Sequence, residues 1–398
     1  MKILQISPQV PFPLDSGGRL SIFGITESMS RRGHIVDFLT YNKELDITEA
    51  AKTLAPFATP HILDYQPDNH AIGALFNFFS EIPYNLSKFK TKKLSDFIYH
   101  YFRNNKPDIV HIDHSHMGWI IDIIKNISDV PVVLRQHNLE LKIMQRFSEQ
   151  AQNPFIKFYS NIQYKKFLKY EPALCEKFDN CIMITKEDEK ELLELNSKIK
   201  TSYIPAGVDS SLLNKKRKNI IPNSIIHLGS LNWLPNLDSI TYFLNDIFPI
   251  ILKNVPDSKL YVYGTGIDKL VIPDSLKKYV IVKGYVKDIW QEISDKQIAI
   301  TPLRVGGGMR IKIIELMAFG MPIVTTGIGK EGIDAENKKH LLEANTAIDF
   351  ANSVLDLFSG ECNNSDISKN SKLLVEEKYT WESVGARFEQ LYQSLILK

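Results

Sequence analysis

Short apolar runs alternate with longer amphipathic segments along the whole 398-residue chain. This alternation is typical of parallel strands joined by crossover helices. Because 398 residues exceed what one hydrophobic core usually organises, the pattern predicts an α/β protein with two doubly wound, Rossmann-like domains. Strands are predicted in the first half at Lys2–Ser7, Ile35–Tyr41, Ile109–Asp113, Val130–Gln136 and Asn180–Thr185. Strands are predicted in the second half at Ser224–Leu228, Lys259–Tyr263, Val280–Lys283, Ile298–Thr301 and Pro322–Thr325.

The domain junction is predicted from a turn and a charged run near the middle of the chain. Proline and glycine in Tyr203–Asp209, followed by the basic run Asn214–Asn219, indicate a turn and a solvated surface linker. We therefore predict an N-terminal domain over residues 1–205 and a C-terminal domain over residues 206–378. Residues 379–398 carry apolar side chains at helical spacing and predict a packing helix, which would cross back to the N-terminal domain. Two such domains facing one another would bind a ligand in a crevice at the carboxyl ends of both sets of strands.

Composition excludes several classes of protein. Lys and Arg (48) nearly balance Asp and Glu (46), so no overall charge favours a nucleic-acid partner. The three cysteines form neither a metal-ligand pattern nor a disulfide framework, which suits a reducing compartment. The first apolar run is too short for a signal peptide and no stretch reaches the roughly 18 to 20 apolar residues of a membrane span. These features predict a cytoplasmic protein.

A glycine-rich loop in the second half carries the strongest chemical signal. Gly306–Gly308 lie between a predicted strand and a predicted helix, where bare backbone amides and the positive end of the helix dipole can bind an anion. Arg310 and Lys312 are predicted in the first helical turn, where cations are disfavoured unless an anion such as a diphosphate neutralises them. Glu315 would then lie near a nucleotide ribose; alternatively it forms a surface ion pair with Lys312.

A second pair of glycines follows the first predicted strand. Gly17 and Gly18, followed by Arg19, precede a helix predicted over Leu20–Arg32. At a helix start they would approach a phosphate or an acceptor, with a plain tight turn as the alternative.

Polar side chains gather where two predicted strands of the first half end. Because ligands of α/β sheets bind at the carboxyl ends of the strands, we regard these side chains as site candidates, and we expect His111 to belong to the core. The candidates are Asp113, His114, His137, Asn138 and Glu140.

Several segments together resemble the group 1 family of retaining glycosyltransferases, which have the GT-B fold. Ile204–Asp209 is similar to the family's interdomain Ile-Pro-Asn-Gly-Val-Asp, and the glycine-rich loop followed by Arg-x-Lys-x-x-Glu is similar to one branch of the family. The other matching segments, in the family's order, are His227–Trp233, Tyr263–Gly266, Gly284–Asp288 and Thr380–Trp381.

The resemblance implies a function. It implies metal-independent, retaining transfer of a sugar, of the hexosyltransferase type, from a nucleotide-diphosphate sugar to a glycan or lipid-linked acceptor in cell-surface polysaccharide or glycoconjugate biosynthesis. It implies no cofactor beyond the nucleotide sugar as substrate, and catalytic roles for His137, Arg310 and Lys312. The implied donor-binding positions are Gly17, Gly18, Gly229, Gly284, Val286, Gly307, Gly308, Met309 and Glu315. Weaker acceptor or sugar-binding candidates are Arg19, Asp113, His114, Asn138 and Glu140.

The chain departs from the family's pattern in two places. Gly307 stands where many members have the first of two glutamates, the second being matched by Glu315. Gly229 is followed by Ser230–Asn232 instead of a basic pair, so Arg310 and Lys312 would be the principal diphosphate ligands. Gly307 leaves open the alternative of a noncatalytic nucleotide-sugar-binding partner subunit. A second alternative is a nucleotide-sugar 2-epimerase, another GT-B enzyme, which binds the same donor but needs no acceptor. A dinucleotide oxidoreductase is not favoured, because Gly264–Gly266 lacks the third glycine of the dinucleotide-binding fingerprint.

A basic segment with interleaved aromatic residues gives one further hypothesis. Lys88, Lys90, Lys92 and Lys93 would each contribute on the order of 1 kcal/mol beside an anionic membrane. The segment therefore raises the hypothesis of peripheral contact with the inner face of the membrane; the alternative is a solvated helix face.

Overall fold

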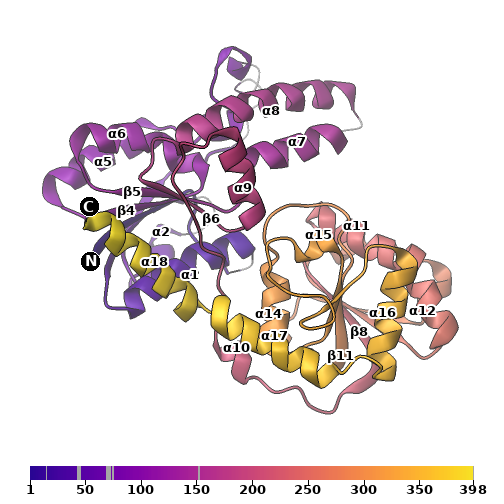
Figure 1. Ribbon diagram of the computed structural model, residues 1–398. Helices are drawn as coiled ribbons and strands as arrows, with labels where there is room; N and C mark the ends of the chain where they lie inside the picture. The colour runs from indigo at the N-terminus through magenta and orange to yellow at the C-terminus, as the bar shows by residue number, and fades with distance from the viewer. Residues whose placement is uncertain (15, 43–45, 69–72, 74–75, 151–152, 398) are drawn as a thin grey trace. The chain divides into compact units, whose positions relative to one another are not determined.

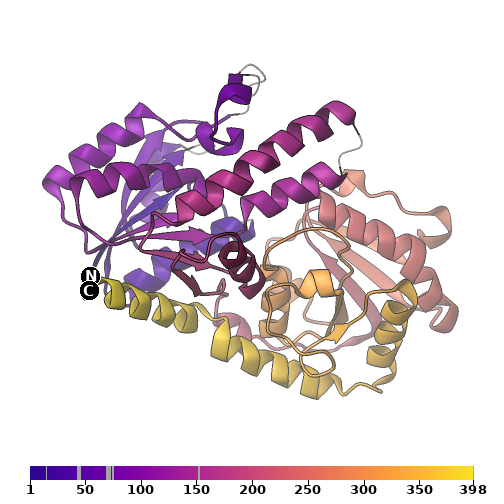
Figure 2. The same cartoon turned by 45° about the horizontal axis from the view of Figure 1, so that its top comes forward.

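The protein is described by a computed structural model over residues 1–14, 16–42, 46–68, 73, 76–150 and 153–397. It divides into two compact units (Figure 1). The first unit comprises Met1–Pro205 together with Val384–Lys398, and the second comprises Ala206–Ser383. Each unit is built around one parallel β-sheet with helices packed against it (Figures 1 and 2).

The sheet of the first unit has seven strands in the order β3-β2-β1-β4-β5-β6-β7, all paired in parallel. The strand order reverses between β1 and β4, where Ile3 pairs with Ile109 and Ile6 with Ile112. The strands are β1 (Lys2–Ser7), β2 (Ile35–Asn42), β3 (Thr59–Asp64), β4 (Ile109–Asp113), β5 (Val132–Gln136), β6 (Asn180–Met183) and β7 (Thr201–Tyr203).

The sheet of the second unit has six strands in the order β10-β9-β8-β11-β12-β13, again all parallel. Its order reverses between β8 and β11, so the two units share one topology. The strands are β8 (Ile221–Leu228), β9 (Lys259–Tyr263), β10 (Val280–Gly284), β11 (Lys296–Thr301), β12 (Ile323–Thr325) and β13 (Leu342–Glu343).

The helices connect these strands. Those of the first unit are α1 (Gly17–Arg31), α2 (Ile47–Leu54), η1 (Asn77–Phe79), α4 (Tyr84–Ser87), α5 (Lys92–Asn104), η2 (Ser115–Ile120), α6 (Ile121–Ile127), α7 (Glu140–Gln150), α8 (Pro154–Cys175) and α9 (Lys186–Leu195). Those of the second unit are α10 (Ser211–Asn214), α11 (Leu234–Tyr242), η3 (Phe243–Ile247), α12 (Phe248–Asn254), η4 (Ile267–Lys269), η5 (Asp274–Leu276), α13 (Ile289–Glu292), α14 (Ile311–Phe319), α15 (Gly327–Lys330), α16 (Ala347–Ser359) and α17 (Asn364–Lys378). Within the described ranges, no helix is long and apolar enough to cross a membrane.

The final helix, α18 (Trp381–Ile396), begins in the second unit and packs within the first. Gly385 lets it approach α1, because a Cβ there would lie 2.0 Å from the hydroxyl oxygen of Ser28. Phe388 and Tyr392 are fully buried, and the Tyr392 hydroxyl lies 2.5 Å from Nδ1 of His111 on β4. The end of the chain is therefore part of the first unit's core, where His111 also lies as expected.

The strand predictions agree with the structure where apolar runs are long. Lys2–Ser7, Ile109–Asp113 and Lys259–Tyr263 have the predicted bounds, and the other predicted strands differ at their ends by up to three residues. Sequence analysis missed β3, β7 and β13. β3 carries proline and histidine at a sheet edge and is mostly half-buried, and β7 and β13 are too short to give an apolar run.

The basic run of the predicted linker is partly structural, which corrects the expectation of a solvated surface segment. The Arg217 guanidinium donates hydrogen bonds to the backbone oxygens of Gly320 at 3.0 Å and Gln297 at 2.7 Å. Burial lowers its pKa to about 10. Arg217 therefore ties the start of the second unit to β11 and to the end of α14.

Phe388→Ala should destabilise the first unit by about 3 to 5 kcal/mol, because it removes a buried aromatic ring and leaves a cavity between α18 and β4. Urea unfolding followed by circular dichroism measures the loss. Leu397→Ala, at a residue directly after the same helix that is 86% exposed, is the matched control and should change stability by less than about 0.5 kcal/mol. Equal effects of the two substitutions would show that α18 is not docked as described.

Candidate active site

The two sheets each place polar residues at the point where their strand order reverses. In open parallel sheets, ligands bind outside the carboxyl ends of the strands at this switch point. In the first unit the switch lies between β1 and β4, and in the second between β8 and β11. The predicted site residues lie at or after the ends of β1, β4 and β5 in the first unit and of β8, β10 and β11 in the second, so each unit has a candidate site of its own.

Asp113, the last residue of β4, is the centre of the polar network in the first unit. Its carboxylate is fully buried and accepts a hydrogen bond from Gln5 Nε2 at 2.9 Å. Its Oδ1 lies 3.2 Å from His137 Nε2 and 3.3 Å from His111 Nε2. Burial alone would raise the pKa of Asp113, but His111, His137 and Arg135 hold it well below the usual value. Asp113 is therefore a fixed anion.

Arg135 supplies the buried positive charge and was missed as a site residue. Its guanidinium is fully buried on β5, 3.5 Å from Asp113 Oδ1, and donates to the Ser21 hydroxyl at 2.6 Å and the Ser21 backbone oxygen at 3.2 Å. The available signal was an arginine inside an otherwise apolar buried strand. Arg135 connects β5 to the second turn of α1.

His114 and His137 stack on one another beside this ion pair. Their ring centroids are 3.8 Å apart with 23° between the planes. Burial, with the nearby Arg135 charge, lowers the pKa of His137 to about 4, and burial with the His137 charge lowers that of His114 well below 6.5. His114 also has a φ of 65°, which L-residues rarely adopt and which recurs at functional sites. Both imidazoles are therefore neutral near pH 7 and suited to hydrogen bonding.

The glycines after β1 belong to a helix, which corrects one boundary. α1 begins at Gly17 and not at Leu20, so Gly17 and Gly18 form its first turn, and the Ser16 side chain caps it by accepting from Arg19 N at 3.5 Å. A Cβ on Gly18 would meet nothing within 4 Å. The helix start therefore leaves open space beside Gly18, one turn before the residue that binds Arg135.

Asn138 and Glu140 follow β5 at the start of α7, next to a buried carboxylate that sequence analysis did not single out. Glu171 accepts hydrogen bonds from the backbone N–H groups of Glu140 at 3.1 Å and Leu141 at 2.9 Å, and from Gln136 Nε2 at 3.0 Å. Burial raises the pKa of Glu171 to about 8. Asn138 and Glu140 are half-buried. Glu171 thus fixes the start of α7 directly after the polar cluster.

In the second unit, glycines line the carboxyl ends of β8, β9 and β10. Gly229, Gly264 and Gly284 all have positive φ, at 150°, 137° and 70°. A Cβ on Gly264 would lie 2.1 Å from the backbone oxygen of Gly229, and Gly264 N donates to Gly284 O at 2.8 Å. Close backbone packing therefore requires Gly264, which the predicted site did not include. Val286, two residues beyond Gly284, is half-buried.

Lys312, in the first turn of α14, reaches across to the end of β8. Its ammonium donates to the backbone oxygen of Leu228 at 3.0 Å and to Asn236 Oδ1 at 2.8 Å. A Cβ on Gly229 would lie 3.2 Å from Lys312 Nζ, so glycine makes room for the cation. Burial, followed by the charge of Arg310, lowers the pKa of Lys312 to about 7. Asn236, on α11, was not predicted.

Arg310 lies one residue before the first turn of α14, at the N-cap position. Its side chain is only 5% exposed, its guanidinium donates to the backbone oxygens of Gly307 and Gly308, and it lies 5.5 Å from the ring of Trp233. Gly308 has a φ of 74°, which favours glycine. Arg310 therefore folds back on the glycine-rich loop, and the neighbouring Met309 is buried.

Glu315 does not pair with Lys312, in contrast to the alternative considered from sequence. It lies one turn further along α14, where burial and then the charge of Asp209 raise its pKa to about 7. A carboxyl group in this state can donate or accept a hydrogen bond near neutral pH. Lys312 and Glu315 thus remain separate polar groups on one helix.

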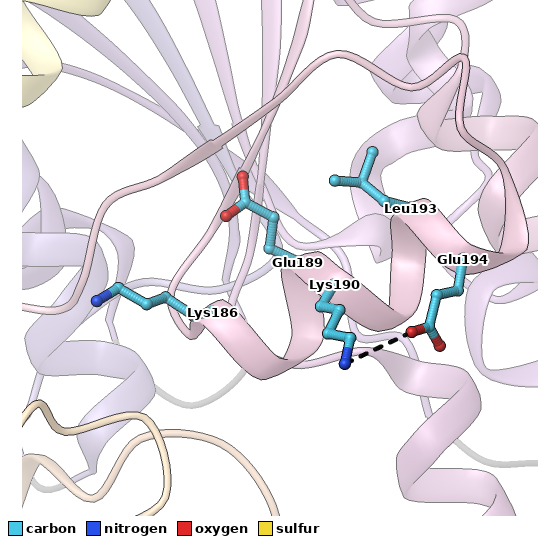
Figure 3. Close-up of a pocket in the computed structure, with 5 residues that line it drawn as sticks. All are labelled: Lys186, Glu189, Lys190, Leu193 and Glu194. Carbon is cyan, nitrogen blue, oxygen red and sulfur yellow. Dashed lines mark ion pairs between the residues drawn. The ribbon is translucent and has the colours of Figure 1, made fainter.

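One further feature of the first unit lies on the surface of a helix. A surface hollow is lined by the α9 side chains of Lys186, Glu189, Lys190, Leu193 and Glu194, with an exposed ion pair between Lys190 and Glu194 at 3.8 Å (Figure 3). It contains no predicted site residue. Across the described parts of the chain, no group of three or more His, Cys, Asp or Glu side chains is placed to hold a metal ion.

Family models of glycosyltransferases match both parts of the chain. A family model described as "Glycosyltransferase Family 4" matches residues 16–212, and one described as "Glycosyl transferases group 1" matches residues 222–360. A Klebsiella pneumoniae protein, named "Uncharacterized 44.6 kDa protein in cps region", is 25% identical over 400 residues, which cover 96% of this chain and 97% of that protein.

Solved structures share the fold. Sucrose-phosphate synthase from Thermosynechococcus elongatus has a TM-score of 0.73 at 17% identity, covering 100% of both chains. HepE from Anabaena, in complex with UDP and glucose, has a TM-score of 0.66 at 14% identity, covering 99% of this chain and 100% of the other. These similarities, with the two parallel-sheet units, confirm the predicted GT-B fold.

Arg135→Met should destabilise the first unit by about 3 to 5 kcal/mol, because it leaves the buried Asp113 carboxylate without its neighbouring cation. Chemical denaturation measures the change. Arg304→Met is the matched control: Arg304 pairs with Asp238 at 2.5 Å near the surface, and its loss should change stability by about 1 kcal/mol or less. An Arg135→Met variant as stable as the control would contradict a charged network at the end of β4.

Proposed function

We propose that this chain is a group 1 glycosyltransferase of the GT-B fold that transfers a sugar from a nucleotide-diphosphate sugar to a glycan or lipid-linked acceptor. The observation that carries the proposal is the Lys312 ammonium, held beside Gly229 at the β8–β11 switch point of the second unit. A half-buried cation at the start of a helix, next to a glycine-lined strand end, fits an anionic ligand and especially a diphosphate. The HepE complex with UDP and glucose supports this class of donor.

Lys312 and Arg310 would stabilise the leaving diphosphate. Negative charge grows on the phosphate as its bond to the sugar breaks, and fixed cations in a water-poor site lower the energy of that state. Lys312 is held by two neutral oxygen acceptors, and within the described parts of the chain no carboxylate pairs with it. Arg310 holds the glycine-rich loop, whose backbone would complete the phosphate site.

Transfer is proposed to be metal-independent and to retain the configuration of the sugar. The two cations do the work that a divalent ion does in other sugar transferases, and the acceptor would attack from the face that the phosphate leaves, with a phosphate oxygen taking its proton. His137, as a neutral imidazole whose Nε2 accepts a hydrogen bond from Arg135, would carry its proton on Nδ1 and donate from there to the transferred sugar. Gly17 and Gly18, at the start of α1, would approach the leaving phosphate or the acceptor.

The assignment to cell-surface polysaccharide or glycoconjugate biosynthesis is part of the proposal. The Klebsiella pneumoniae relative, whose name places it in a cps region, supports this assignment. Lys90, Lys92 and Lys93 are exposed. Their contact with an anionic bilayer would bring the enzyme to a lipid-linked acceptor on the cytoplasmic side. Lys88 is half-buried.

A noncatalytic nucleotide-sugar-binding subunit is the second candidate, favoured by Gly307 in place of the family's first glutamate. The two candidates differ in turnover. An enzyme of the proposed type releases nucleoside diphosphate from its donor, slowly with water and faster with an acceptor, whereas a binding subunit leaves the donor intact. Chromatography of candidate nucleotide sugars incubated with the protein distinguishes them.

Lys312→Met should weaken binding of the preferred nucleoside diphosphate by about 1.5 to 3 kcal/mol, the scale of a charge-assisted hydrogen bond, and should abolish transfer. Isothermal titration calorimetry measures the affinity. Lys277→Met, which removes an exposed lysine paired with Asp274 in the same unit, is the control and should bind like the wild type. Unchanged affinity in Lys312→Met would remove this lysine from the donor site.

The same site predicts a pH dependence. The pKa of Lys312 is about 7 in the free protein, and a bound diphosphate would raise it, so binding takes up a proton above pH 7. Affinity should therefore be highest below about pH 7 and fall as the pH rises towards about 9, where the free lysine is neutral. Lys312→Met should lose this pH dependence.

A further inference from the structure

Large apolar side chains are exposed at one end of the first unit. Phe79 and Phe155 are 93% and 85% exposed, and three more phenylalanines are more than half exposed. Large apolar side chains exposed together on neighbouring elements often mark a binding surface. We call this set the aromatic surface; it consists of Phe76, Phe79, Phe147, Phe155 and Phe158.

The aromatic surface is built on packed elements. α7 and α8 lie side by side as a helical hairpin (Figures 1 and 2), so the last turn of α7 lies near the start of α8. The last turn of α7 carries Phe147, and the start of α8 carries Phe155 and Phe158. The short helix η1 packs on α8: the Phe78 and Tyr159 rings are 5.6 Å apart, and Gln163 Nε2 donates to Asn77 Oδ1 at 3.1 Å. These contacts hold the exposed phenylalanines of η1 beside the same helix.

The helix beneath the aromatic surface is strongly basic. Pro154–Tyr170 contains four lysines and no acidic residue, although the whole chain has a net charge of only +2. Lys157, Lys165 and Lys169 are exposed, while Lys166 donates to Asn77. The backbone N–H of Tyr84, on α4, donates to Gln163 at 2.9 Å, so α4 contacts α8. The basic segment that begins at Lys88 follows α4 directly in the chain.

We infer that the aromatic surface docks the protein on an anionic lipid bilayer. Phenylalanine rings insert into the boundary between headgroups and acyl chains, while lysine stems extend so that their ammonium groups meet the phosphates. A second copy of the chain fits less well, because a symmetric contact would place unpaired lysines against lysines. This docking rests on the membrane contact in the proposed function and adds to it a surface on α7, α8 and η1, outside the candidate active site.

Co-sedimentation with vesicles tests the inference. Wild-type protein should bind phosphatidylglycerol–phosphatidylcholine vesicles and release them at high salt, and should bind pure phosphatidylcholine weakly. Phe155→Ser with Phe158→Ser should lower the partition coefficient on anionic vesicles by about tenfold or more. Lys157→Ser with Lys165→Ser and Lys169→Ser should remove the preference for anionic lipid.

The control replaces exposed apolar residues of the second unit. Val271 and Ile348 are 80% and 63% exposed, and Val271→Ser with Ile348→Ser should bind vesicles like the wild type. Calorimetric titration with nucleoside diphosphate, unchanged in every variant, reports that the donor site and fold are intact. A wild type that fails to sediment with anionic vesicles would overturn the inference. So would phenylalanine variants that sediment equally well, or a wild-type dimer in sedimentation velocity that these variants dissociate.

Discussion

All strands of both sheets run parallel, and this constraint determines where the chain can do chemistry. Parallel strands end at one edge of a sheet, and where the strand order reverses, the two loops leaving neighbouring strands turn to opposite faces. The β1–β4 and β8–β11 pairs are such points, and they carry Asp113 with its histidines in one unit and Gly229 with Lys312 in the other. The same topology in both units explains why two unlike residue sets occupy equivalent places.

The two sites handle buried charge differently, and the difference fits the roles proposed for them. In the first unit, Asp113 and Arg135 form a buried ion pair with further hydrogen bonds, so their charges are compensated within the protein. In the second, the acceptors of Lys312 among the described residues are neutral, and its pKa is near 7. Leaving a half-buried cation without a counter-ion is unfavourable. An anionic ligand removes that penalty, whereas the first site already holds its rings in fixed, neutral positions.

Sequence alone predicted the fold class and most of the strands, because long apolar runs such as Lys2–Ser7 are a local property of the chain. It also predicted which loops carry polar groups, since glycine-rich turns and histidines after strands are local signals too. The partners of those groups were not predictable. His111 meets Tyr392, 281 residues later, and Lys312 meets Asn236, 76 residues earlier, so only the folded chain brings them together. Arg135 was visible as a charge within an apolar strand, but its pairing with Asp113 depends on the order of the strands.

The central claim is that the second unit binds a nucleoside diphosphate through protein cations. A thermal-shift screen against UDP, GDP, ADP, dTDP and CMP, with and without EDTA, tests it most directly. A specific ligand at a hundred times its dissociation constant adds about 2.7 kcal/mol to stability, so we expect one diphosphate to raise the melting temperature clearly, equally in EDTA. No shift with any of the five nucleotides, or a shift that EDTA abolishes, would contradict the claim.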